Sequence, residues 1–183
     1  MIKPTDSRLF IFALSLLFFS CDLEIPEDSY NNPLDIEFNA ENGIAPPALI
    51  FSPGESTVTV GQVVNVNVFA LEVDSLAGVY LQVIYDPSRL SLNSVTVGDI
   101  FKSNQAPIFF YNEDSGSGYV SIYSSFLGNT VAVTGTGSLA ALSFTTLSAG
   151  TSTLRLGTDT EIVDRNDNKI ILNGTGTGEV IAQ

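Results

Sequence analysis

The chain has 183 residues, of which 44% are hydrophobic, so it can form one domain with a packed core and global disorder is not expected. Its formal net charge is −13 with only 7 Lys and Arg residues, which argues against binding to nucleic acid or other polyphosphates. The sequence contains no His, the commonest general base and metal ligand, and its single Cys excludes an internal disulfide. These totals favour a binding role over a catalytic one.

Residues 1–20 have the pattern of an export signal. Lys3 and Arg8 precede an apolar run over 9–20 that is interrupted only by two serines. A basic start followed by a short apolar run is typical of a secretory signal, and this run is too short to span a bilayer comfortably. We therefore predict a signal peptide over 1–20 and export of the mature chain.

The sole cysteine, Cys21, follows this apolar run directly. Residues 18–21, Phe-Phe-Ser-Cys, resemble a bacterial lipobox, in which the cysteine is acylated and becomes the first residue of the mature protein. An ordinary signal peptide with an incidental cysteine is the alternative. Because more than one acyl chain anchors a protein stably, we expect a lipoprotein of the cell envelope, at the outer membrane or cell surface.

Residues 21–47 are expected to form a tether between the anchor and the folded domain. The segment is rich in acidic residues, Asn and Pro, shows little periodicity, and ends at Ala45-Pro46-Pro47. Proline stiffens such a segment and like charges extend it. The predicted organisation is therefore a signal peptide over 1–20, a tether over 21–47 and one domain over 48–183.

From Ala48 onward the apolar residues alternate with polar or mixed ones. The alternation is clearest over 64–69, 78–85, 119–123 and 142–145. A period of two, in segments rich in Val, Ile, Thr, Tyr and Phe, predicts strands with one buried face. Short turn sequences separate these segments, so we predict an all-β domain of about nine strands in a two-sheet sandwich. A closed barrel is the alternative.

Five segments of this domain resemble the cohesin family in sequence and in order. They are 58–68, 77–90, 95–101, 135–144 and 164–171. The most informative is the strand that ends in Tyr-Asp-Pro at 85–87 and is followed by Leu90. Cohesins are jelly-roll sandwiches that bind dockerin modules, which need calcium to fold, and so assemble polysaccharide-degrading complexes. The resemblance covers 48–183 and implies a jelly-roll sandwich with a dockerin-type protein partner.

The sequence departs from the cohesin pattern at two positions. The best-known dockerin binders carry polar residues seven and five positions before the tyrosine of Tyr-Asp-Pro, where this chain has Gly78 and Tyr80. The resemblance therefore does not settle which partner the chain binds. Direct binding of polysaccharide, by a carbohydrate-binding module of the same fold, is the alternative function. A structural spacer without a specific ligand is a third.

The exposed face of the Tyr-Asp-Pro strand supplies the candidate partner-binding residues. Alternation places Tyr80, Gln82 and Ile84 on that face, and a nearby strand contributes Tyr119 and Tyr123. Aromatic side chains outside the core anchor protein partners or stack on sugar rings. The alternative is that loops or the tether cover these residues.

The acidic turns are not expected to carry chemistry. Residues 164–169 resemble a calcium loop, but Lys169 stands where that loop needs glycine and Thr175 where it needs glutamate, so a hairpin turn is expected. Residues 114–118 are also expected to form a turn. Glu113 and Asp114 adjoin the aromatic candidates, but no histidine or reactive cysteine is available to support catalysis. We therefore expect no enzyme, no metal site and no cofactor.

Overall fold

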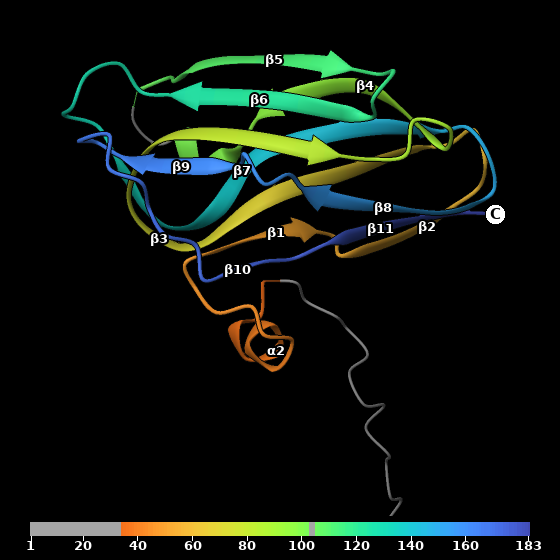
Figure 1. Ribbon diagram of the computed structural model, residues 1–183, viewed down its shortest axis with the longest axis horizontal. Helices are drawn as coiled ribbons and strands as arrows, with labels where there is room; N and C mark the ends of the chain where they lie inside the picture. The colour runs from red at the N-terminus through yellow and green to blue at the C-terminus, as the bar shows by residue number, and fades with distance from the viewer. Residues whose placement is uncertain (1–33, 103–104) are drawn as a thin grey trace, which may run out of the picture. The chain divides into compact units, whose positions relative to one another are not determined.

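The computed structural model describes residues 34–102 and 105–183. These residues form one short α-helix, one 3-10 helix and eleven strands (Figure 1). In chain order the elements are α2 (Ile36–Glu41), β1 (Ala48–Ser52), β2 (Glu55–Val58), β3 (Val63–Ile84), β4 (Leu90–Val97), η2 (Asp99–Phe101), β5 (Ile108–Asp114), β6 (Tyr119–Ser125), β7 (Val133–Thr146), β8 (Gly150–Leu156), β9 (Glu161–Asp164), β10 (Gly174–Thr175) and β11 (Gly178–Ala182).

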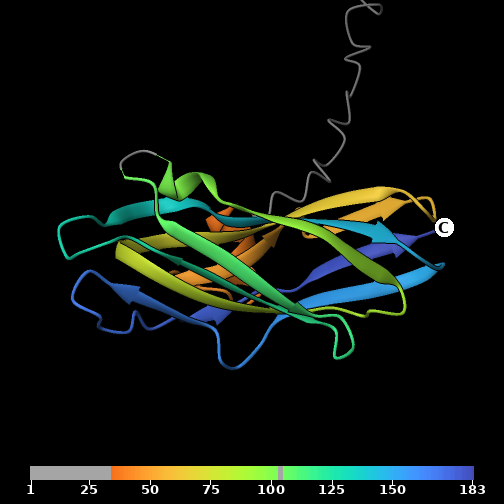
Figure 2. The same ribbon diagram turned by 90° about the horizontal axis from the view of Figure 1, so that it is seen from above.

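The strands form two layers around one core, which confirms the prediction of an all-β sandwich. One layer has the order β9–β3–β6–β5, and the other has the order β10–β1–β3–β7–β4. Strands β8, β11 and β2 continue the sheet at one end. Figure 1 shows β5 and β6 on the opposite side of the core from β1 and β10, and Figure 2 views the domain from the side of β5.

Strand β3 belongs to both layers. The alternation predicted two separate strands over 64–69 and 78–85, but the structure joins them in one strand of 22 residues. Its register shifts twice between Ala70 and Leu76, where Glu72 and Ser75 have φ of +47° and +55°. The backbone N–H groups of Glu72 and Ser75 donate hydrogen bonds to two threonine hydroxyls of β7, at 3.1 and 3.0 Å. These irregularities let one strand pass from the first layer to the second.

The segment before β1 is folded on the domain, which the prediction of a tether over 21–47 did not include. Helix α2 begins after Asp35, whose side chain accepts hydrogen bonds from two N–H groups of the first turn at 2.8 and 3.2 Å. Leu34 and Ile44 pack against a small cluster formed by Ala48, Ile50 and Leu71. Burial of Leu34 and Ile44 therefore holds 34–47 against the sandwich.

Several earlier predictions lie outside the described residues. The signal peptide over 1–20, the acylated Cys21 and the tether as far as residue 33 belong to this part of the chain. Among the described residues, no helix is long and apolar enough to cross a membrane.

The predicted turns are present. Asp86, two residues after the end of β3, accepts the N–H of Ser88 at 2.9 Å, and Leu90 is buried in the core beyond it. In the turn over 164–169, Asp164 Oδ1 accepts the N–H groups of Asn166 and Asn168 at 2.7 and 2.9 Å. Hydrogen bonds from Asn168 hold the pKa of the Asp164 carboxyl below its ordinary value. The segment is a hairpin turn, and no cluster of three possible metal ligands occurs in 34–102 or 105–183.

One buried hydroxyl gives a test of the packing. Ser124 in β6 is 2% exposed, and its Oγ makes no hydrogen bond to the described residues. Because Ser124→Ala removes an unpaired polar group, we expect the free energy of unfolding to stay equal or to rise by up to about 1 kcal/mol. The matched control is Ser138→Ala, since Ser138 Oγ is buried and accepts the N–H of Asp99 at 2.7 Å.

The control should lose about 1–3 kcal/mol, because the Asp99 N–H is left without its partner. Urea unfolding of the wild type and the two variants measures both changes. A loss in Ser124→Ala as large as that in Ser138→Ala would contradict the assignment of an unpaired hydroxyl.

Candidate partner-binding face

The layer β9–β3–β6–β5 turns one face to the core and leaves the other open. In the second half of β3, Val79, Leu81 and Val83 are at most 7% exposed and belong to the core. Alternation turns Tyr80 and Gln82 to the opposite face, as predicted. We call this second face of the four strands the open face.

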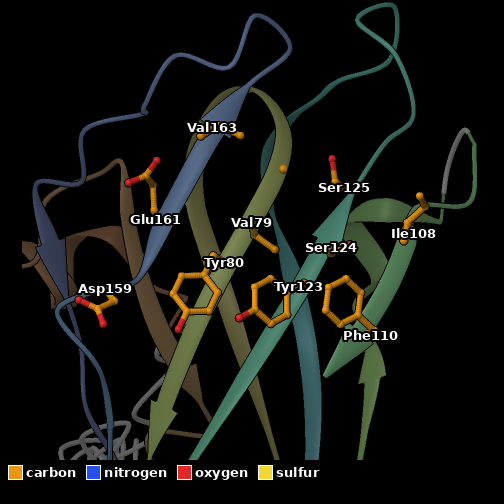
Figure 3. Close-up of a pocket in the computed structure, with 11 residues that line it drawn as sticks. Val79, Tyr80, Ile108, Phe110, Tyr123, Ser124, Ser125, Asp159, Glu161 and Val163 are labelled. Atoms are coloured by element: carbon orange, nitrogen blue, oxygen red, sulfur yellow. The ribbon is translucent and has the colours of Figure 1, made fainter. Parts of the chain in front are cut away.

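Cross-strand pairing brings a row of four side chains together on the open face. The row runs from Glu161 in β9 through Tyr80 in β3 and Tyr123 in β6 to Phe110 in β5 (Figure 3). The ring centroids of Tyr80 and Tyr123 are 4.8 Å apart, and those of Tyr123 and Phe110 are 4.5 Å apart. The ring planes meet at only 27° and 13°, so the rings are stacked and each covers part of its neighbour. We call these three rings the aromatic row.

The neighbouring row is hollow because its two central residues are small. It consists of Val163, Gly78, Ser125 and Ile108, again one residue from each strand. A Cβ atom placed on Gly78 would lie 3.0 Å from Val163 Cγ2 and 3.4 Å from Ser125 Oγ, so this position has little spare room. Together with the aromatic row, these residues line a pocket of about 540 Å³, which is within the size range of ligand sites.

The two ends of the pocket differ in charge. Asp159, in the loop before β9, and Glu161 line the end at β9, whereas Ile108 and Phe110 line the end at β5 and are 49% and 55% exposed. Glu161 pairs with Lys169 at 3.3 Å, but both side chains are exposed, so this ion pair is weak. Asp159 pairs with no cation among the described residues. The pocket is therefore acidic at one end and apolar at the other.

The structure brings only two of the five predicted binding residues into the pocket. Tyr80 and Tyr123 line it, but Gln82 lies beneath the loop that joins β8 to β9. Gly157 N donates to Gln82 O at 2.7 Å, and a Cβ on Gly157 would lie only 1.9 Å from the side-chain oxygen of Gln82. Ile84 and Tyr119 pair with each other beyond this covered position, outside the pocket lining.

Sequence reasoning missed most of the lining, including the residues at both ends of the pocket. Ile108 and Phe110 were not assigned, although the apolar run over 108–111 directly before a predicted turn is a strand signal. Asp159 and Glu161 were not linked to the site, since only the pairing of β9 with β3 places them beside Tyr80. Their sequence positions carry no sign of this proximity.

Glu113 and Asp114 do not form a carboxylate pair on the open face. They are consecutive in β5, so their side chains point to opposite faces of the strand. Glu113 accepts a hydrogen bond from the hydroxyl of Tyr85, whereas Asp114 Oδ1 accepts the N–H of Ser117 at 3.0 Å in the following turn. Burial raises the pKa of Tyr85 well above its ordinary value of 10.0, and the hydrogen bond to Glu113 is the second cause of this increase.

A comparison with protein families identifies the chain. The model of the cohesin domain family matches residues 51–181. The chain belongs to the cohesin domain family. Cohesins are a family of non-catalytic binding modules. No curated protein sequence matches the chain.

Solved cohesin structures share this fold. A non-cellulosomal cohesin from the archaeon Archaeoglobus fulgidus is 18% identical with a TM-score of 0.62, covering 74% of this chain and 90% of that one. The sixth cohesin of scaffoldin B from Acetivibrio cellulolyticus, solved with a mutant Cel5 dockerin, is 17% identical with a TM-score of 0.64, covering 74% and 98%. The cohesin of a type I cohesin–dockerin complex from Clostridium thermocellum is 15% identical with a TM-score of 0.63, covering 74% of this chain and 98% of that one. At these identities the similarity shows the jelly-roll fold.

Burial of Tyr85, together with its hydrogen bond to Glu113, predicts a dependence of stability on alkaline pH. The unfolded chain releases the Tyr85 proton near pH 10.0, whereas the folded protein retains it, so stability falls as pH rises above that value. In Tyr85→Phe we expect the fall in the free energy of unfolding per pH unit to be smaller by up to about 1.4 kcal/mol. Denaturant unfolding between about pH 9 and pH 11 measures this slope.

Tyr111→Phe is the control, because it removes an exposed phenol and keeps the Tyr85–Glu113 hydrogen bond. It should therefore retain the wild-type slope. Equal slopes in Tyr85→Phe and the wild type would show that the folded protein does not hold the Tyr85 proton.

Proposed function

We propose that the chain is a cell-surface cohesin that binds a dockerin-type protein through the open face, without catalytic activity of its own. The observation that carries this proposal is the aromatic row, which ends in an exposed Phe110 beside the pocket. Exposed aromatic side chains that cluster over a pocket are typical of protein interaction sites. Membership of the cohesin family, with solved relatives in dockerin complexes, supports a dockerin as the partner.

The arrangement of the rings favours a protein partner over a polysaccharide. Sugar rings stack on aromatic faces that lie open to solvent. In the aromatic row, Tyr123 lies between Tyr80 and Phe110 at 4.8 and 4.5 Å, so much of its face is already covered. Ring edges and the hollow beside them suit insertion of a side chain from a protein surface.

The proposal includes export and a lipid anchor at Cys21, which lies outside the described residues. The basic start at Lys3 and Arg8, the apolar run over 9–20 and the position of the only cysteine support it. Acylation at Cys21 would leave the domain at the surface of a membrane, where a bound partner stays attached to the cell.

Binding to purified dockerin modules from the same genome tests the partner. With the full chain in detergent, we expect at least one module to bind in calorimetry with calcium present and to lose binding when calcium is chelated. Phe110→Ala and Tyr123→Ala should each weaken the affinity by at least about tenfold, because central aromatic residues dominate such interfaces.

Leu147→Ala is the matched control, since Leu147 is 50% exposed but lies in the loop after β7, outside the pocket lining. It should bind like the wild type. Failure of every dockerin module to bind would overturn the proposed partner. Retention of the chain on an insoluble polysaccharide in the same series would favour the carbohydrate-binding alternative.

Metabolic labelling with a radioactive fatty acid tests the anchor. We expect the wild-type chain to carry the label and to fractionate with membranes, and Cys21→Ser to lose the label because the acylated thiol is gone. Ser20→Ala keeps a small residue before the cysteine and serves as the labelled control. An unlabelled wild type, or a label that survives Cys21→Ser, would rule out acylation at this residue.

A further inference from the structure

We infer that the pocket selects a partner that inserts a large apolar side chain over Gly78 and Ser125 and places a Lys or Arg beside Asp159 and Glu161. This inference rests on the proposed function, because it assumes that a protein occupies the open face. It adds the chemistry that distinguishes the right partner from other proteins of its class.

The walls of the pocket call for an apolar side chain. Val163, Ile108 and the aromatic row supply the large side chains of its apolar part. Two hydroxyls of the open face are already engaged: the Ser125 hydroxyl donates to Phe126 O at 3.1 Å, and the hydroxyls of Tyr80 and Ser121 are 3.3 Å apart. The Ser124 hydroxyl is unpaired but 2% exposed, so it offers little to an inserted side chain. A polar side chain inserted here would lose its hydrogen bonds to water without full replacement. An apolar side chain instead is stabilised by the removal of its surface from water.

The depth of the pocket depends on the pair of small residues. Gly78 and Ser125 are cross-strand neighbours, with Val163 on one side and Ile108 on the other. A Cβ on Gly78 would already lie within 3.0 Å of Val163 Cγ2, so any larger residue there must displace a wall. The hollow is therefore a consequence of residue choice at these two positions, and a branched side chain at either would fill it.

The acidic end calls for a cation at a fixed place relative to that apolar side chain. Asp159 has no cationic partner among the described residues, and Glu161 has only the weak pair with Lys169. Figure 3 shows Asp159 and Glu161 beside Tyr80, away from Phe110 and Ile108. Carboxylates at the rim of an interface steer a basic partner and penalise an acidic one. The whole chain, at a net charge of −13, adds to this attraction.

Tyr80 provides a further contact for the cation. Tyr123 covers one face of its ring, and the other face is turned toward β9 and the two carboxylates. A guanidinium placed there would contact both a negative charge and an aromatic face. The geometry therefore orients the partner, with its apolar side chain toward β5 and its cation toward β9.

Selection from a display library tests this pattern. The full chain in detergent is the bait, and the library is one dockerin module with its exposed positions randomised. We expect the selected binders to share one large apolar residue and one Lys or Arg. We also expect binding of these modules to weaken as salt is raised, because the cation lies at the rim.

Variants of the chain separate the two contacts. Asp159→Asn with Glu161→Gln should weaken binding about tenfold at low salt and remove most of the salt dependence. Glu55→Gln with Glu179→Gln is the control, because it makes the same change in net charge on β2 and β11, and it should bind like the wild type. Gly78→Ala and Ser125→Val fill the hollow from different strands and should each weaken binding at least about tenfold.

The unfolding transition of each variant is measured alongside, so that Ser125→Val tests the pocket if Gly78→Ala proves unstable. Binders without the shared apolar residue and cation, or binders unaffected by Asp159→Asn with Glu161→Gln, would overturn the inference and leave the proposed function intact. Absence of any dockerin binder, native or selected, would instead overturn the proposed function.

Discussion

Within β3, the alternation of buried and exposed residues shifts by one position. This change of phase determines which side chains form the core and which form the open face. In the first half of β3 the even-numbered Val64, Val66 and Val68 face the core, whereas in its second half the odd-numbered Leu81 and Val83 do. The irregularities at 72 and 75 and a third register shift between Leu76 and Gly78 together produce this change, because each one moves the buried set by one residue. Without it the opposite set of side chains would turn inward. A slip of one residue exchanges the two faces of a strand completely. The core of one layer and the composition of the open face therefore have the same origin.

The shape of the open face comes from the residues of β3 that this alternation turns away from the core. Gly78 and Tyr80 are two positions apart in β3, so they contribute to adjacent rows, one hollow and one aromatic. Because both rows are built on paired strands, their side chains are held in place before a partner arrives. Such preorganisation reduces the entropy lost on binding. At the acidic end, the pairing of β9 with β3 likewise fixes Glu161, and Asp159 lies beside it in the loop before β9.

Sequence patterns predicted the parts of this arrangement that are local. Alternation was sufficient to place Tyr80 and Tyr123 on the outer face and to predict a sandwich. It could not predict Phe110 or Glu161, because their position beside the tyrosines depends on strand register between segments distant in the chain. The cover over Gln82 has the same cause, since a loop after β8 supplies it. The continuity of β3 was also hidden, because the positive-φ residues within it are neither Gly nor Asn.

The acidic charge of the open face affects both self-association and the choice of partner. Among the described strands, β5 pairs with β6 alone and is an edge strand. It carries exposed Ile108 and Phe110, features that invite pairing with a second copy of the chain. Glu113 and Asp114 close the same strand, and the acidic end of the pocket lies across the layer. Two copies that approached through this face would bring like charges together, whereas a basic partner would neutralise them. The acidity that discourages self-association is therefore also the property that favours a cationic partner for the apolar surface of the pocket.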